Sequence, residues 1–283
     1  MLGRMMDFPL TLPSLIERAR TSSPSTEVVS KDAAGVVTRT TWGALGARAA
    51  KLANALARLG VKPGTRVATL AWNHERHLEA YFAIPAMGAV LHTLNLRLHP
   101  NDLAYIANHA EDEVVLVDAS LLPLVDAFKA QVPSLKHVIV FDRDYEELLA
   151  QESDAFAWPK LDENDAAILC YTSGTTGSPK GVLYSHRSTT LHALVAVMPD
   201  CLGLSERDCV MPVVPMFHAN AWGLPQMCAL TGAKLVLHGP MLDPVSLLDL
   251  LVAENVTIAA RVPTIWLGIL AALDAERKAW DLS

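Results

Sequence analysis

The chain has 283 residues, of which 51% are hydrophobic and 19% charged, and its formal net charge is −7. This composition predicts a packed globular protein and excludes an intrinsically disordered one. The acidic balance provides no broad basic face, so duplex nucleic acid, which needs many phosphate-neutralising cations, is not an expected partner. At this length one hydrophobic core usually gives way to two domains or two halves of a larger unit.

The first clear element is an amphipathic helix over residues 42–59. Its apolar residues recur along one stripe, Thr40 and Thr41 precede it as candidate caps, and Gly60 ends it. Short strand patterns then alternate with helical patterns, which indicates an α/β fold with mainly parallel sheets. The predicted strands are 66–70, 114–118, 137–141, 167–171, 181–184, 209–214, 234–238 and 256–260.

The polar segment 153–165 reads as a join between two layered α/β subdomains, which we predict at 1–160 and 161–283. A helix predicted at 263–274 is the last element. The sequence stops at Ser283, where the α/β alternation would supply its next strand. We therefore expect the second subdomain to be truncated at its C-terminal end.

The N-terminus and the cysteines indicate a cytoplasmic protein. Acidic residues and prolines interrupt residues 1–20, where a signal peptide needs an unbroken apolar segment. The cysteines at 170, 201, 209 and 228 form no C-x-x-C pair, which argues against a zinc knuckle, a dithiol motif or a disulfide framework. We interpret them as buried thiols in a reducing compartment.

Residues 209–233 contain no Asp, Glu, Lys or Arg, and this length could cross a bilayer. Prolines and polar residues interrupt the stretch at Pro212, Pro215, His218, Asn220, Pro225 and Gln226. Each of them would lose a helix hydrogen bond or need a polar partner in lipid. We therefore predict a strand, a loop and a helix buried in the protein and no transmembrane span. A peripheral membrane contact and a homo-oligomer stay open.

A loop of small residues follows the strand predicted at 167–171. Residues 171–181 read Tyr-Thr-Ser-Gly-Thr-Thr-Gly-Ser-Pro-Lys-Gly, a pattern in which glycines and hydroxyls can surround a phosphate while the lysine adds a charge. The alternative is a surface turn. The P-loop pattern is absent because Pro179 precedes the lysine and Gly181 follows it. The candidate phosphate-binding residues are Thr172, Ser173, Gly174, Thr175, Thr176, Gly177 and Lys180.

Residues 171–182 resemble the signature loop of the adenylate-forming ligases, which comprise acyl-coenzyme A synthetases, peptide-synthetase adenylation domains and luciferases. Further blocks at 60–67, 87–98, 214–222 and 262–266 resemble the same family in the same order, with Thr65 in place of the usual aspartate. The resemblance covers nearly the whole chain. Residues 185–187 and 216–218 indicate its fatty-acid branch.

The resemblance implies a two-step reaction. A carboxylate attacks the α-phosphorus of ATP bound with Mg²⁺, giving acyl-adenylate and pyrophosphate, and the thiol of coenzyme A then takes the acyl group. Lys180 would stabilise the departing pyrophosphate, and Thr175 would supply a metal ligand. By the same resemblance His218 is a catalytic candidate, and His218, Ala219 and Trp222 would contact the substrate.

Purely structural roles are the alternatives for the substrate-binding candidates. A lone histidine in an apolar stretch is more often a satisfied core group than a catalytic one, and Trp222 could be a core residue. The apolar stretch 213–230 has no acidic residue to bind an amino-acid ammonium. A fatty acid, which gains about 0.8 kcal/mol for each buried methylene, is therefore the expected substrate.

Family members also carry a Tyr-Gly-x-Thr-Glu block with a magnesium-binding glutamate, a ribose-binding aspartate, a hinge and a C-terminal catalytic lysine. None of these occurs in the 283 residues. We therefore expect the N-terminal part of a fatty-acid CoA ligase that is inactive as an isolated chain. The alternatives are a non-catalytic nucleotide- or acyl-binding remnant and an atypical α/β NTPase.

Two histidine-containing motifs lead to no catalytic prediction. His74-Glu-Arg-His77 is one residue short of the zinc motif H-E-x-x-H, so we predict a solvated helix face. Ser185-His186 lacks the G-x-S-x-G pattern of a hydrolase. Ser185 and Ser188 are therefore interpreted as loop or helix-cap residues.

Overall fold

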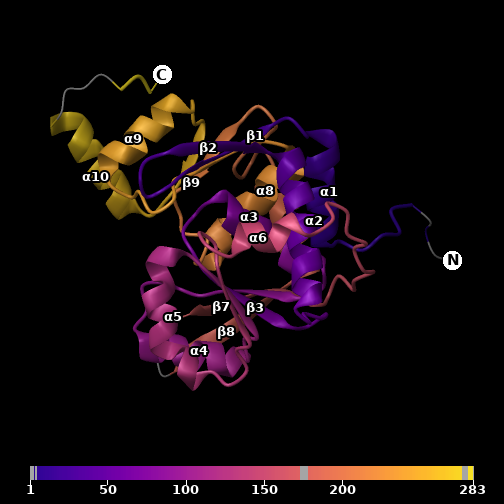
Figure 1. Cartoon of the computed structure of the whole chain (residues 1–283). Coiled ribbons are helices and arrows are strands. Elements are labelled where there is room, and N and C mark those ends of the chain that lie inside the picture. The colour runs from indigo at the N-terminus through magenta and orange to yellow at the C-terminus, as the bar shows by residue number, and fades with distance from the viewer. Residues whose placement is uncertain (1–2, 4, 173–177, 276–279, 283) are drawn as a thin grey trace.

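A computed structural model describes residues 3, 5–172, 178–275 and 280–282. Its strands form two separate sheets, and helices lie on both sides of each (Figure 1). The sheets are mainly parallel, as the sequence predicts, because most connections between neighbouring strands are crossovers through a helix.

The six-stranded sheet has the order β6-β5-β3-β4-β7-β8. Its strands are β3 (Arg66–Leu70), β4 (Val90–Thr93), β5 (Val114–Val117), β6 (His137–Val140), β7 (Ala166–Thr172) and β8 (Lys180–Ser185). All neighbours are parallel except β7 and β8, which form an antiparallel hairpin. The chain moves from β3 to β4 on one side and then crosses to β5 on the other, which is a doubly wound arrangement.

The five-stranded sheet has the order β11-β9-β10-β1-β2. Its strands are β1 (Glu27–Lys31), β2 (Val37–Thr41), β9 (Cys209–Pro212), β10 (Lys234–Leu237) and β11 (Ile258–Ala260). Only the β1–β2 pair is antiparallel. The edge strand β2 is largely exposed, whereas the centre of β1 is buried between β2 and β10.

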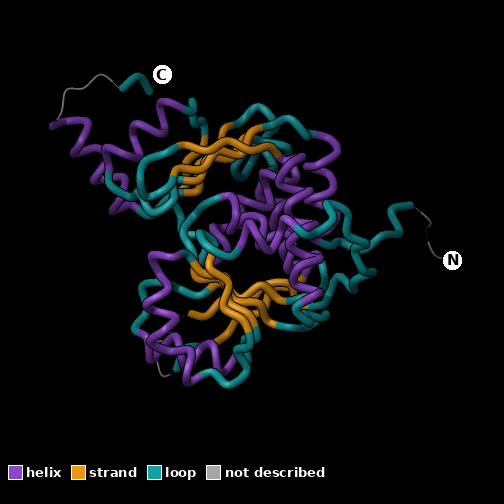
Figure 2. Tube along the Cα trace, viewed as in Figure 1, coloured by secondary structure: helices purple, strands orange, loops and turns teal. Residues whose placement is uncertain are grey.

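Helices occupy three layers that alternate with the two sheets (Figure 2). They are α1 (Leu12–Ser22), α2 (Trp42–Arg58), α3 (Glu75–Ala86), α4 (Pro100–Ala110), α5 (Leu122–Phe128), α6 (Tyr145–Ala150), α7 (His186–Ala196), α8 (Leu224–Thr231), α9 (Pro244–Ala253) and α10 (Pro263–Ala275), with 3-10 turns η1 (Ala119–Leu121), η2 (Lys129–Gln131) and η3 (Ala219–Gly223). Helices α4 and α5 cover the outer face of the six-stranded sheet, and α9 and α10 cover the outer face of the five-stranded sheet. Helices α1, α2, α3 and α8 pack between the sheets.

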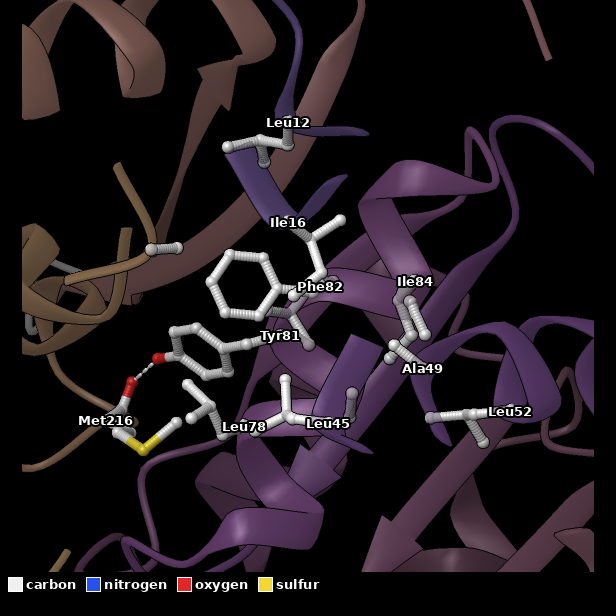
Figure 3. Packing of buried hydrophobic residues seen from close by; sticks show 14 of the residues in the cluster. Leu12, Ile16, Leu45, Ala49, Leu52, Leu78, Tyr81, Phe82, Ile84 and Met216 are labelled. Carbon is white, nitrogen blue, oxygen red and sulfur yellow. Dashed lines mark hydrogen bonds between the residues drawn. The ribbon is translucent and has the colours of Figure 1, made fainter. Parts of the chain in front are cut away.

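The central layer contains the largest core. Helix α2 begins where the Thr41 hydroxyl accepts a hydrogen bond from the backbone nitrogen of Ala44 at 3.2 Å, which confirms the predicted cap. The Trp42 ring packs edge-on against Phe82 of α3, with ring centroids 6.1 Å apart. Figure 3 shows leucine, isoleucine and aromatic side chains of α1, α2 and α3 meeting in this layer. Because both sheets cover α3, every residue of this helix from His77 to Ala86 is buried.

The predicted strands are confirmed, and so are the helices predicted at 42–59 and 263–274. Their boundaries are shifted by up to two residues. The β1–β2 hairpin was not predicted. The sheets do not follow the boundary predicted between residues 160 and 161, because β1 and β2 join the later strands and β7 and β8 join the earlier ones. The division into 1–160 and 161–283 as folding units stays a prediction.

Several local predictions can be compared with the structure. The uncharged stretch 209–233 forms β9, η3 and α8, as predicted, and none of the described helices combines the length and hydropathy that crossing a bilayer requires. Ser185 caps α7, and its hydroxyl accepts a hydrogen bond from the nitrogen of Ser188 at 3.0 Å. Cys201 is exposed in the loop after α7, so the prediction of buried thiols holds only for the other three cysteines.

The prediction of a solvated face for His74 and His77 is wrong. Both side chains are buried because α3 begins between the two sheets. His77 is held by the Trp72 carbonyl at 2.9 Å and the Thr69 hydroxyl at 3.0 Å. Burial lowers the pKa of His77 to about 3, so its ring is neutral at pH 7.

Candidate functional site

The small-residue loop is closed at its base by the β7–β8 hairpin. Thr172 pairs with Lys180 at the end of the ladder, next to the pair of Tyr171 and Gly181. Thr172 and Lys180 are exposed at this end of the sheet. Residues Ser173, Gly174, Thr175, Thr176 and Gly177 lie outside the described residues, so their predicted contacts stay predictions.

The carboxyl ends of β4 and β7 meet at the base of this loop. The two strands are parallel, and Thr93 lies opposite Cys170, with 3.3 Å between the Thr93 hydroxyl oxygen and the Cys170 sulfur. Asn95, two residues beyond β4, therefore lies at the same sheet edge as Thr172. Ligands of open α/β sheets bind along this kind of edge.

A left-handed turn over residues 219–222 approaches the same edge. Ala219, Asn220, Ala221 and Trp222 have φ values of 43°, 55°, 49° and 55°. A left-handed conformation costs an L-residue about 1–2 kcal/mol, and such strain persists where the surroundings enforce it. Burial raises the pKa of the Cys170 thiol, and this thiol donates a hydrogen bond to Asn220 Oδ1 at 3.1 Å. The turn is thereby tied to β7 directly ahead of the loop.

Two buried side chains hold the segment before this turn. They are Asn73, which follows β3 of the six-stranded sheet, and Tyr81 of α3. Asn73 Oδ1 accepts a hydrogen bond from the nitrogen of Met216 at 2.8 Å, and Asn73 Nδ2 donates to the carbonyls of Pro212 and Val214 at 2.9 and 3.0 Å. The Tyr81 hydroxyl donates to the Met216 carbonyl, as Figure 3 shows. These contacts fix the backbone that presents Phe217 and His218.

These elements enclose a pocket of about 280 Å³. It is lined by Asn95, Arg97, Val214, Pro215, Phe217, His218, Trp222, Arg261 and Val262. The structure thus brings His218 and Trp222 together, whereas Ala219 begins the adjoining turn and does not line the pocket. The Trp222 side chain is 42% exposed, which contradicts the alternative that it is a core residue.

The charged groups of the pocket are cationic, and sequence reasoning missed them. Among the described residues no Asp or Glu lines it, and the guanidinium of Arg97 lies over the Phe217 ring at 5.9 Å. Arg261 Nη1 is buried and has no hydrogen-bond partner in the described part of the chain. Burial and the charge of Arg97 lower the pKa of Arg261 to about 10. Both arginines occur in or beside blocks that carry the family resemblance, which is the signal that could have found them.

The described residues contain no group of three or more His, Cys, Asp or Glu side chains that could hold a metal ion. The hydroxyl predicted as a metal ligand, that of Thr175, lies outside the described residues. A metal-binding role for this region is therefore a prediction from the resemblance alone.

A second cavity, of about 410 Å³, lies at the carboxyl ends of β3 and β5, where the doubly wound sheet changes direction. Four acidic residues line it, Asp32, Glu75, Asp118 and Asp142. His74 Nε2 lies 2.8 Å from Asp118 Oδ1, and Arg76 Nη2 donates to Asp142 Oδ1 at 3.0 Å. The smaller pocket is therefore the better candidate for an anionic ligand.

Comparisons with known proteins show the family of the chain. Residues 16–283 match the model of the AMP-binding enzyme family. The chain is 49% identical over 285 residues to the medium-chain-fatty-acid–CoA ligase of Ectopseudomonas oleovorans, covering 96% of this chain and 52% of that protein. It is 51% identical over 278 residues to the long-chain-fatty-acid–CoA ligase of Thermus thermophilus, with coverages of 96% and 51%.

Among solved structures, the inhibitor-bound N-terminal domain of FACL13 from Mycobacterium tuberculosis superposes with a TM-score of 0.86 at 26% identity. The match covers 96% of this chain and 67% of that one. The chain spans about half the length of the two ligases that it matches.

Proposed function

The chain belongs to the AMP-binding enzyme family, and on that premise we propose that it binds ATP and a fatty acid for the formation of an acyl-adenylate and then of acyl-coenzyme A. Its relatives named as fatty-acid CoA ligases support this assignment. Those relatives are about twice as long as the chain. The chain would contribute the phosphate-binding loop and the wall of the acid pocket.

One observation carries the proposal. The base of the small-residue loop, the end of β4 and the segment 214–222 converge on one edge of the six-stranded sheet. A nucleotide whose phosphates lie in the loop would therefore place its α-phosphorus near the pocket that contains His218. An acid bound in that pocket would have its carboxylate beside the phosphorus that it must attack, and such proximity lowers the barrier.

The pocket chemistry fits an apolar acid with an anionic head. Val214, Phe217, Trp222 and Val262 supply apolar surface, and no described carboxylate repels the substrate. The buried and unpartnered Arg261 Nη1 supplies a donor for an anion. A fatty acid matches this combination better than an amino acid, whose ammonium group would find only cations here.

Each candidate residue then has a chemical role. Lys180, at the exposed base of the hairpin, would neutralise charge on the departing pyrophosphate. Mg²⁺, when bound, supplies further charge neutralisation on the phosphates, and the candidate ligand is the Thr175 hydroxyl. His218 would orient the carboxylate, and Trp222 would cover the acyl chain. Coenzyme A is the acyl acceptor in this proposal.

Product analysis tests the proposal. The 283-residue chain is incubated with ATP labelled at the α-phosphate, octanoate and coenzyme A, and the products are separated. We expect saturable ATP binding that octanoate strengthens, and any turnover should release AMP and pyrophosphate. Release of ADP and phosphate would indicate an NTPase instead. ATP binding that is indifferent to octanoate would indicate a nucleotide-binding module without ligase function.

A further inference from the structure

Two arginines in the 280 Å³ pocket lack the acidic partners that most of the other described arginines have. Arg48 is paired with Glu79 and Glu146, and Arg39 with Glu27 and Glu254. By contrast, neither Arg97 nor Arg261 has an ion pair or a side-chain hydrogen bond within the described residues. Arg97 is exposed, whereas Arg261 is partly buried. A buried guanidinium nitrogen without an acceptor or a counterion is costly, so the placement of Arg261 needs a physical reason.

The neighbouring groups increase this cost. Burial, and after it the charge of Arg97, lowers the pKa of Arg261, which nevertheless stays protonated at pH 7. On another side of Arg261 lies His238, whose pKa is lowered to about 4 by burial and then by the charge of Arg261. His238 is therefore neutral and cannot repel or compensate the guanidinium. The pocket is left with two like charges and no described anion.

The backbone adds positive potential to the same place. Helix α10 begins at Pro263, two residues after Arg261, and the N-terminal end of a helix carries a partial positive charge. The Arg97 guanidinium carbon lies over the Phe217 ring, 5.9 Å from its centroid, and Phe217 is next in sequence to His218. The planar N–H fork of a guanidinium at the pocket wall suits an oxyanion.

We propose that Arg97 and Arg261 form an oxyanion subsite that holds one anionic group of a bound substrate, either the carboxylate of the acid or a phosphate of the nucleotide. The inference rests on the proposed function for the identity of these substrates, although the subsite itself rests on the charges of the pocket. Arg97 and Arg261 act in it as binding residues.

Calorimetric titration of the 283-residue chain with octanoate and, separately, with pyrophosphate tests the subsite. We expect Arg97→Gln and Arg261→Gln each to lower the affinity for at least one of the two anions by about tenfold or more, the scale of a charged hydrogen bond. The matched control is Arg143→Gln, because Arg143 is an exposed arginine paired with Asp144 on the surface. The control should leave both affinities unchanged.

The two probes distinguish the sources of the anion. A lower affinity for octanoate alone assigns the subsite to the carboxylate. A lower affinity for pyrophosphate alone assigns it to a phosphate. Unchanged affinity for both anions in both variants, or no binding of either anion by the unsubstituted chain, overturns the subsite. If ATP fails to bind but the variants still bind octanoate or pyrophosphate more weakly than the unsubstituted chain, the proposed function fails and the subsite stands.

Thermal unfolding separates this role from a structural one. In buffer without multivalent anions, Arg261→Gln should melt no lower than the unsubstituted chain, because it removes one of two repelling charges. Pyrophosphate or octanoate should raise the melting temperature of the unsubstituted chain more than that of the variant. A lower melting temperature for Arg261→Gln together with an equal ligand-induced rise would overturn the proposal. If that variant does not fold, Arg261→Lys, which keeps the charge and loses the fork, replaces it in the titrations.

Discussion

The side chain of Asn73 holds the backbone of Met216, with 2.8 Å between Asn73 Oδ1 and the Met216 nitrogen. Asn73 follows β3 of the six-stranded sheet, and Met216 follows β9 of the five-stranded sheet. A second link lies beside the first, because the nitrogen of Gly239 donates to the Asn73 carbonyl at 2.9 Å. Gly239 has a φ of +60°, and a Cβ there would lie 2.0 Å from the Lys31 carbonyl oxygen, so only glycine fits. Asn73 thus joins the two sheets where the candidate pocket forms.

Replacement of Asn73 by alanine should destabilise the protein by about 2–4 kcal/mol, because it leaves buried backbone groups at residues 212, 214 and 216 without partners. Urea unfolding measures this loss. Asn54→Ala is the matched control, since Asn54 also donates to two carbonyls, those of Ser153 and Ala155, but does so at the surface. Equal losses for the two variants would show that Asn73 does not hold the segment as described.

The stability of the protein should fall between pH 6.5 and pH 4. Burial lowers the pKa of His77 to about 3, and burial lowers the pKa values of His186 and His238 to about 4, from an ordinary value of 6.5. In this window the unfolded chain binds protons at these rings and the folded chain does not. Protons therefore favour unfolding, and each ring lowers the free energy of unfolding by about 2 kcal/mol at pH 5.

Urea unfolding at several pH values checks this expectation. The unfolding free energy of His186→Gln should depend less steeply on pH between 6.5 and 4 than that of the unsubstituted chain. The glutamine can still accept the hydrogen bond that the Leu12 nitrogen gives to His186 Nδ1. Parallel pH profiles for the two proteins would contradict the assignment of a buried neutral ring.

The extent to which the sequence predicts this structure differs between its parts. Strand β7 and the lysine after the loop were predictable because an apolar run meets an unusual density of glycines and hydroxyls. The β1–β2 hairpin was missed because charged residues stand at both ends of β1 and β2 has an exposed polar face, so neither shows a clear period. His77 was misjudged because Glu75 and Arg76 beside it read as a solvated surface, whereas two sheets bury this part of α3.

The pocket itself depends on tertiary contacts that no periodicity encodes. Asn73 reaches a segment far along the chain, and Arg97 and Arg261 come together only because the two sheets meet. The family resemblance found His218 and Trp222 but not the cations between which a ligand would lie. Side-chain chemistry of this kind becomes visible once the sheet order is known.

Trp222→Ala should weaken octanoate binding by about tenfold, because the indole supplies apolar cover to the acyl chain. Binding of ATP alone should be unaffected, since the indole lies in the acid pocket. Trp158→Phe is a suitable control. The Trp158 indole donates a hydrogen bond to Glu17 of α1, and Trp158 does not line the pocket. Calorimetric titration with octanoate measures the effect, and equal affinity in both variants would remove Trp222 from the substrate site.

The affinity for linear acids should rise with chain length. Each added methylene should gain about 0.8 kcal/mol, which is about fourfold in affinity, as long as it enters the apolar part of the pocket. Titration with the series from butanoate to decanoate, in the presence of ATP, tests this dependence. Affinities that do not change with length would contradict a fatty-acid substrate while leaving the nucleotide site intact.

The central claim is that the hairpin closed by Thr172 and Lys180 receives the phosphates of a nucleotide. Equilibrium dialysis of labelled ATP against the 283-residue chain, against Lys180→Ala and against Lys129→Ala tests it most directly. Lys129 is an exposed lysine of the turn η2, paired with Asp126. We predict saturable binding by the chain and by Lys129→Ala, and binding weaker by about tenfold or more in Lys180→Ala. Absence of saturable binding, or equal affinity in all three proteins, would contradict the account.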